Sequence, residues 1–293
     1  VHGFNVNATD KTYWPGTVFK RLWWQGYKGH LGFFDWPCAM FPSYNDSDFN
    51  AWRCGAALLD RISQLNSGAH SGKVRVLAHS QGNVVMGEML RLASGQVVHT
   101  YIATQAAIAG DCYQAGLPDY FTGFTTPNVY ETYPPTGNTY LNGVLAAAGQ
   151  TFSYYNADDF ALRTAAVGSW EMNNEMKPDF NYWYHEVDGN VDTYAWPSEY
   201  FFYDSLLSFD TRVMSFPNDR QEIFSHDAEA RSQALGVLSS INGFTGFNLQ
   251  SAPFNYNSAH YSHSRQFRSN VVDEWAYWQE LKVNLWILAG NIS

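Results

Sequence analysis

The chain has 293 residues, with 17 lysines and arginines against 27 aspartates and glutamates, and a formal net charge of −10 at pH 7. This acidic balance, without any block of basic residues, argues against nucleic acids and anionic membrane surfaces as partners. The apolar runs are short and interrupted by polar residues, so the sequence predicts no transmembrane segment.

The three cysteines of the chain are Cys38, Cys54 and Cys112. Three cysteines allow at most one disulfide bond, and their spacing is not that of metal ligands. The low content of lysine, together with abundant Tyr, Asn, Ser and Gly, favours a secreted or extracytoplasmic location.

The first residues, Val1-His2-Gly3-Phe4-Asn5, have the pattern of a buried strand that ends in a loop. Because nothing upstream supplies the rest of that strand, we expect the first strands of the sheet to be missing from the chain. Apolar spacing predicts a helix over about residues 17–27, and residues 32–37 predict a short strand that Pro37 ends. A second helix is expected to begin at Asp46 or Ser47 and to reach residue 65.

Strand and helix patterns then alternate along the chain. Strands are predicted over residues 74–78, within 97–108 and over 150–155, with a helix over 82–94. This alternation predicts a single α/β domain over residues 1–293, with a mostly parallel sheet and helices on both faces. Residues 111–149 and 165–210 interrupt the alternation, and we interpret them as insertions that form a cap or surface loops. A strand over 221–224, a helix over 227–237, a loop and a terminal helix over 269–288 complete the chain.

The segment Ala78-His79-Ser80-Gln81-Gly82 lies between a predicted buried strand and a predicted helix. Small residues two before and two after the serine allow a turn tight enough to expose the Ser80 hydroxyl at the carboxyl edge of a sheet. We interpret the segment as a nucleophile elbow, and the alternative is a structural turn between strand and helix. His79 is expected to have a packing role, because such elbows turn this side chain away from the site.

Together with the loop over residues 2–5, this segment resembles bacterial esterase-like and lipase-like members of the α/β-hydrolase superfamily. The resemblance covers nearly the whole chain and departs from the family at Ala78, where the first glycine of the elbow is usual. It implies an α/β-hydrolase fold without cofactor or metal, and an oxyanion hole formed by the backbone N–H groups of Phe4 and Gln81. His2 is expected to be a structural residue of the loop, and a simple turn at Gly3 is the alternative interpretation.

The order of the triad in this family, serine then acid then histidine, directs the search downstream of Ser80. Asp158 and Asp159 follow the predicted strand over 150–155, and the resemblance favours Asp159 as the acid with Asp158 as the alternative. His260 and His263 precede the terminal helix, and the resemblance favours His263 as the base with His260 as the alternative. More remote candidates for the acid are Asp188, Asp204 and Asp227.

These residues predict a serine hydrolase that cleaves small-molecule or polymeric carboxylic esters through an acyl-enzyme. Peptidase, thioesterase and acyltransferase chemistry would use the same triad. A non-catalytic module that binds glycans, polymers or proteins on a hydrolase scaffold is the alternative from another class. A metal site at His185, Glu186 and Asp188 is less favoured than a solvated loop, because the spacing matches no usual ligand set. The oligomeric state is left open.

Overall fold

The structure is a computed structural model, and it describes most of the elements expected from the sequence. Almost all of the predicted insertion over 111–149, the whole of the one over 165–210, and the predicted strand over 221–224 lie outside the described residues. The described residues are 1–4, 6–38, 47, 50–51, 53–68, 71–108, 113, 146–159, 161–162, 234–257, 260–267 and 275–286.

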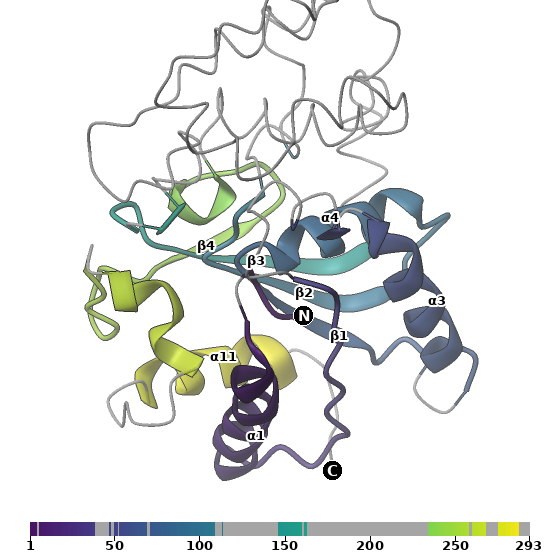
Figure 1. Cartoon of the computed structure of the whole chain (residues 1–293), viewed down its shortest axis with the longest axis horizontal. Coiled ribbons are helices and arrows are strands. Elements are labelled where there is room, and N and C mark those ends of the chain that lie inside the picture. The colour runs from purple at the N-terminus through teal and green to yellow at the C-terminus, as the bar shows by residue number, and fades with distance from the viewer. Residues whose placement is uncertain are drawn as a thin grey trace, which may run out of the picture.

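In the described part of the chain, four strands form one parallel sheet in the order β1-β2-β3-β4 (Figure 1). The strands are β1 (Arg75–His79), β2 (Val98–Thr104), β3 (Ala148–Tyr155) and β4 (Thr245–Asn248). Every neighbouring pair is parallel. The predicted α/β class and parallel sheet are therefore confirmed, and the carboxyl ends of all four strands share one edge.

The first residue of the chain extends this sheet beyond β1. The amino nitrogen of Val1 donates to the carbonyl of Leu77 at 2.8 Å, and the Val1 carbonyl accepts from the N–H of His79 at 3.1 Å. This alternation of bonds is that of a parallel neighbour. The loop that follows Val1 therefore leaves the sheet at the edge where β1 ends.

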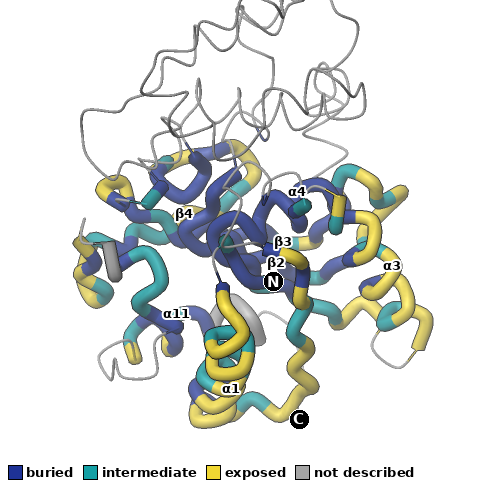
Figure 2. Tube along the Cα trace, viewed as in Figure 1, coloured by how far each residue is buried: buried dark blue, intermediate teal, exposed yellow. Residues whose placement is uncertain are grey.

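Helices cover both faces of the sheet, as predicted (Figure 1). On one face, Tyr101 and Ala103 of β2 belong to a hydrophobic core with α3 (Gly55–Asn66) and α4 (Gly82–Leu92). Ile102, between them, belongs to the opposite core with α1 (Ala8–Trp24) and α11 (Trp275–Trp286). Successive side chains of a strand point to opposite faces, so β2 supplies both cores. Figure 2 shows burial concentrated in the sheet and on the inner sides of the helices.

The first helix begins earlier than predicted, at Ala8 and not near residue 17. Asn7 caps it, because its side-chain oxygen accepts from the N–H groups of Thr9 and Asp10 at 2.8 and 3.0 Å. Pro15 lies inside the helix, where it lacks an N–H and removes one backbone bond. The cap and the interactions of the helix with its neighbours therefore outweigh the cost of the proline.

The predicted strand over 32–37 is wrong, because residues 31–38 have no strand pairing. Trp36 in this segment is buried, and both its backbone and its indole N–H groups bond to His2, at 3.2 and 2.8 Å. Its apolar residues thus pack against the first loop, and not beside a neighbouring strand.

Residues 47, 50, 51 and 53 are helical and precede α3, which begins at Gly55, so helix is present from Ser47 as predicted. The Ser47 hydroxyl donates to the Gln81 side chain at 2.6 Å. Two other elements differ from the predictions. The described end of the predicted helix over 227–237 is the short 3₁₀ turn η5 (Leu235–Val237). The segment expected to be a loop contains β4, followed by the 3₁₀ segment η6 (His260–Phe267).

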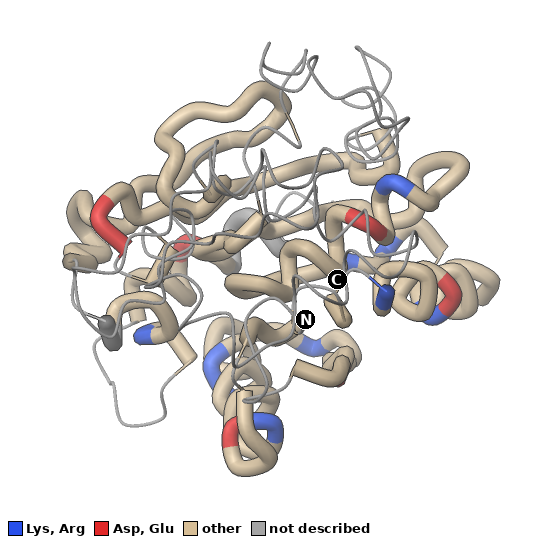
Figure 3. Tube along the Cα trace, turned by 45° about the horizontal axis from the view of Figure 1, so that its top comes forward, with Lys and Arg blue, Asp and Glu red and all other residues tan. Residues whose placement is uncertain are grey.

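None of the helices that the structure describes is long and apolar enough to cross a bilayer. Figure 3 shows the described basic and acidic residues interspersed over the helices and loops.

Candidate active site

Ser80 lies between the end of β1 and the start of α4, in a strained backbone conformation. Its φ angle is +51°, in the left-handed region that residues other than glycine rarely adopt. Its carbonyl accepts hydrogen bonds from the backbone and side-chain nitrogens of Asn83, at 3.0 and 2.8 Å, and from the N–H of Ala107 at 3.1 Å. Its own N–H donates to Thr104 of β2 at 3.2 Å. Four hydrogen bonds thus hold the strained residue in place.

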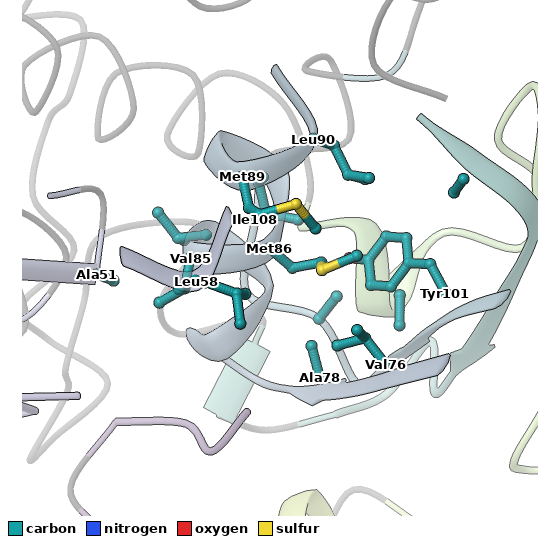
Figure 4. Close-up of a cluster of buried hydrophobic side chains, with 14 of the residues drawn as sticks. Ala51, Leu58, Val76, Ala78, Val85, Met86, Met89, Leu90, Tyr101 and Ile108 are labelled. Carbon is teal, nitrogen blue, oxygen red and sulfur yellow. The ribbon is translucent and has the colours of Figure 1, made fainter. Parts of the chain in front are cut away.

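The residues two before and two after Ser80 are small for different steric reasons. A Cβ at Gly82 would lie 2.3 Å from the carbonyl oxygen of His2, so only glycine fits there. Ala78 is completely buried in the core beneath α4, where Figure 4 shows it near Val76. Its methyl group points into that core and not toward the turn, so the departure from glycine at position 78 leaves the elbow intact.

The loop after Val1 passes directly beside Ser80. A Cβ at Gly3 would lie only 2.6 Å from the Cβ of Ser80. His2 holds this loop: its Nδ1 lies 3.0 Å from the Gly3 carbonyl oxygen, and its Nε2 lies 3.2 Å from the backbone nitrogen of Trp36 and 3.0 Å from Oδ1 of Asp35. Burial is the main cause that lowers the pKa of His2, and the hydrogen bonds to Gly3 and Asp35 act against it. These contacts match the structural role expected for His2.

The two residues predicted to form the oxyanion hole directly follow Gly3 and Ser80, the two residues that approach each other closely. Phe4 is the turn residue that follows Gly3, and Gln81 is the N-cap of α4. The amino end of a helix carries a partial positive charge, which favours a developing anion nearby. Their assignment as oxyanion donors stays a prediction that this placement favours.

The preferred acid and base are joined by a hydrogen bond. The Nδ1 of His263, on η6, donates to Oδ2 of Asp159 at 3.0 Å. Asp159 follows β3 and is 1% exposed, and it also accepts from the Gln105 side chain at 2.5 Å and from the N–H of Leu162 at 3.2 Å. Burial alone would raise the pKa of Asp159. The attraction and hydrogen bond of His263, with the other two donors, outweigh burial and lower it.

The alternatives for the acid and base are placed differently. Asp158 is exposed and accepts from the side chain of Gln250 at 2.6 Å. The side chain of His260 lies outside the described part of the structure, as do Asp188, Asp204, Asp227 and the cluster at 185–188. Within the described residues, no three His, Cys, Asp or Glu side chains are grouped to hold a metal ion.

His79 contacts His263, the candidate base, and the sequence did not predict this contact. Its Nε2 donates to the backbone carbonyl of His263 at 2.6 Å, and the centroids of the two rings are 4.9 Å apart. Because His79 directly precedes Ser80, the backbone of His263 is bound to the residue next to the proposed nucleophile. Among the described residues, no hydrogen bond joins the Ser80 hydroxyl to His263.

Comparisons with protein-family models, with curated proteins and with solved structures found no match. The case for a function therefore depends on the motifs and on the geometry of the site.

Proposed function

We propose that the protein is a serine hydrolase of the α/β-hydrolase fold that cleaves carboxylic esters through an acyl-enzyme on Ser80. The observation that carries this proposal is the hydrogen bond between the buried Asp159 and His263, whose carbonyl is bound by the residue that precedes a serine in a left-handed turn. The chemistry of ester cleavage needs these three groups in one place.

In the proposed mechanism, Asp159 accepts a hydrogen bond from the Nδ1–H of His263, which leaves the lone pair on Nε2 to act as the base. The Ser80 oxygen attacks the ester carbonyl while its proton passes to Nε2, and Asp159 stabilises the resulting cation. Apo sites often have long or unformed catalytic hydrogen bonds that shorten in the substrate complex. We therefore expect the Ser80–His263 bond to form when substrate is bound.

The tetrahedral intermediate carries a negative oxygen, which the N–H groups of Phe4 and Gln81 would stabilise by about 3 kcal/mol each. Collapse of the intermediate expels the alcohol, which takes the proton from His263. A water activated by the same histidine then attacks the acyl-enzyme and releases the carboxylic acid.

The proposal extends to small or polymeric esters as substrates and to a secreted or extracytoplasmic location, which the composition favours. Hydrolysis of peptides or thioesters, and acyl transfer to acceptors other than water, would use the same catalytic groups. A panel of esters, thioesters and amides distinguishes these reactions by the leaving group that is released.

Labelling with a fluorophosphonate probe tests the proposal directly. We expect the wild-type protein to be labelled and Ser80→Ala to remain unlabelled, while the matched control Ser63→Ala, on the exposed side of α3, is labelled like wild type. A folded wild-type protein that the probe does not label contradicts the proposal and favours the binding module. A series of nitrophenyl esters of increasing acyl length then measures the size of the pocket.

A further inference from the structure

The segment that carries His263 is held through two consecutive backbone carbonyls. His79, the last residue of β1, donates its Nε2–H to the carbonyl of His263 at 2.6 Å. Gln105, which directly follows β2, donates its side-chain N–H to the carbonyl of Ser262 at 3.0 Å. The two donors come from adjacent strand ends, so the sheet itself fixes the place of η6.

Gln105 links this segment to the acid. The same amide nitrogen donates to Asp159 at 2.5 Å and to the Ser262 carbonyl, so both of its hydrogens are used. The amide oxygen accepts from Gln266 of η6 at 3.0 Å, which fixes the orientation of the amide. Gln105 is completely buried and has a φ angle of +42°. A buried residue in this strained conformation, with all its polar side-chain atoms bonded, is typical of a functional site.

His79 has the protonation state that this role needs. Its ring is buried, and Nδ1 has no hydrogen-bond partner among the described residues. The single proton of the neutral ring therefore belongs on Nε2, where it meets the His263 carbonyl. Burial is the main cause that lowers the pKa of His79 to about 3. A neutral His79 adds no positive charge beside an imidazole that becomes cationic during the reaction.

We propose that His79 and Gln105 are positioning residues that hold η6 through the carbonyls of His263 and Ser262 and so aim the imidazole of His263 at Ser80. The inference rests on the proposed function, because it assigns these two residues to the same site. Neither residue touches the ester; each acts through the placement of the acid and the base.

Kinetics of ester hydrolysis separate this role from simple packing. His79→Phe keeps a flat ring but lacks the donor, whereas His79→Gln restores an N–H at a similar distance from the backbone. Because small displacements of catalytic groups cost up to about 100-fold in rate, we expect His79→Phe to lower kcat by about 10-fold to 100-fold with little change in KM. We expect His79→Gln to recover most of this loss. If His79→Phe equals or exceeds His79→Gln in kcat, with both folded by circular dichroism, the proposal is overturned.

The role of Gln105 is tested by one variant of this residue and by a control variant elsewhere. Gln105→Met keeps the length of the side chain without its donors, and we expect the same loss of kcat with little change in KM. The exposed Gln64 of α3 provides the control, and Gln64→Met should leave kcat unchanged. An unchanged kcat in Gln105→Met overturns the role of this residue.

A spectroscopic experiment tests the arrangement without any catalysis. In Ser80→Ala protein with ¹⁵N-labelled histidine, we expect His79 to have the Nε2–H tautomer at neutral pH, its signals being assigned by their loss in His79→Phe. A ring protonated at Nδ1 overturns the proposal, even if the enzyme is active. Failure of the fluorophosphonate probe to label wild type would instead overturn the proposed function, and the tautomer of His79 would still be measured.

Discussion

Burial of a neutral His79 predicts a specific loss of stability in mild acid. The pKa of its imidazole falls from 6.5 to about 3 in the folded protein, mainly because burial disfavours the charged ring. Below pH 6.5 the unfolded chain therefore binds a proton that the native state does not. The contribution of His79 to stability is complete above pH 6.5 and is lost progressively as the pH falls toward 3.

The size of this loss of stability follows from the difference between the pKa values of His79 in the unfolded and folded states. One pKa unit corresponds to about 1.4 kcal/mol, so a change from pH 7.5 to pH 4.5 should lower the free energy of unfolding by about 3 kcal/mol through His79 alone. His79→Phe removes this proton-binding site while it keeps a ring in the same space. We expect the variant to be less stable than wild type at pH 7.5, because the His263 carbonyl loses its donor, and to lose about 3 kcal/mol less on acidification.

Urea denaturation of both proteins at pH 7.5, 6.0 and 4.5 measures this difference, with the slopes on urea compared to check that the same surface unfolds. The other titrating groups are common to both proteins, so their contributions largely cancel. Parallel pH dependence in wild type and His79→Phe would show that the ring is protonated or exposed in the folded state. That result would refute the neutral, buried His79 on which the reasoning depends.

Two further predictions concern the site and its surroundings. Asp159→Asn should lower kcat by about 10⁴-fold and Asp158→Asn by less than about twofold, and comparable losses in the two variants would remove Asp159 as the acid. Gly3→Ala places a Cβ 2.6 Å from that of the serine and should cost about 1–3 kcal/mol of stability, whereas Gly16→Ala, with open space around it, should add about 0.5–1 kcal/mol. Thermal unfolding measures the stability of the two glycine variants. A Gly3→Ala variant as stable as wild type would contradict the close packing of the first loop against Ser80.

The elements that the sequence predicted well are those whose local pattern and tertiary environment agree. β1, β2 and β3 are rich in β-branched, aromatic and small residues, and most of their residues are buried, as are most of those of α4. Strands in a parallel sheet that is covered on both faces are mostly buried, so these local patterns were sufficient. The same pattern placed Ser80 correctly between strand and helix.

The elements that the sequence missed depend on distant partners. β4 is short, contains Gly246, and has exposed or half-buried residues, so it lacks an apolar alternation and forms only because β3 offers an edge. The apolar run over 32–37 appeared strand-like, but its aromatic rings stack on His2, with centroids 5.3 Å away for both Phe33 and Trp36. The start of α1 was missed, because the first half of the helix has no apolar face that the spacing could indicate, and the cap by Asn7 is seen only in the structure.

The same limit applied to the candidate site. The candidate serine came from its motif between strand and helix, and the candidate acid and base came from the order of the triad in the family that the chain resembles. Neither the motif nor this order indicated the hydrogen bonds from His79 and Gln105 to η6, which join residues 184 and 157 positions apart. Only the register of β1 beside β2, in which His79 is opposite Thr104, brings these two donors together.

The order of the strands explains why a residue at the end of β2 matters to the site. Ser80 follows β1 and Asp159 follows β3, so β2 separates them by two strand spacings, or about 10 Å. In the proposed mechanism the imidazole of His263 bridges the acid and the serine, so η6 has to lie near the end of β2. Gln105 directly follows β2 and bonds to both Asp159 and the carbonyl of Ser262. We therefore expect the length of its side chain to influence how far His263 stands from Ser80.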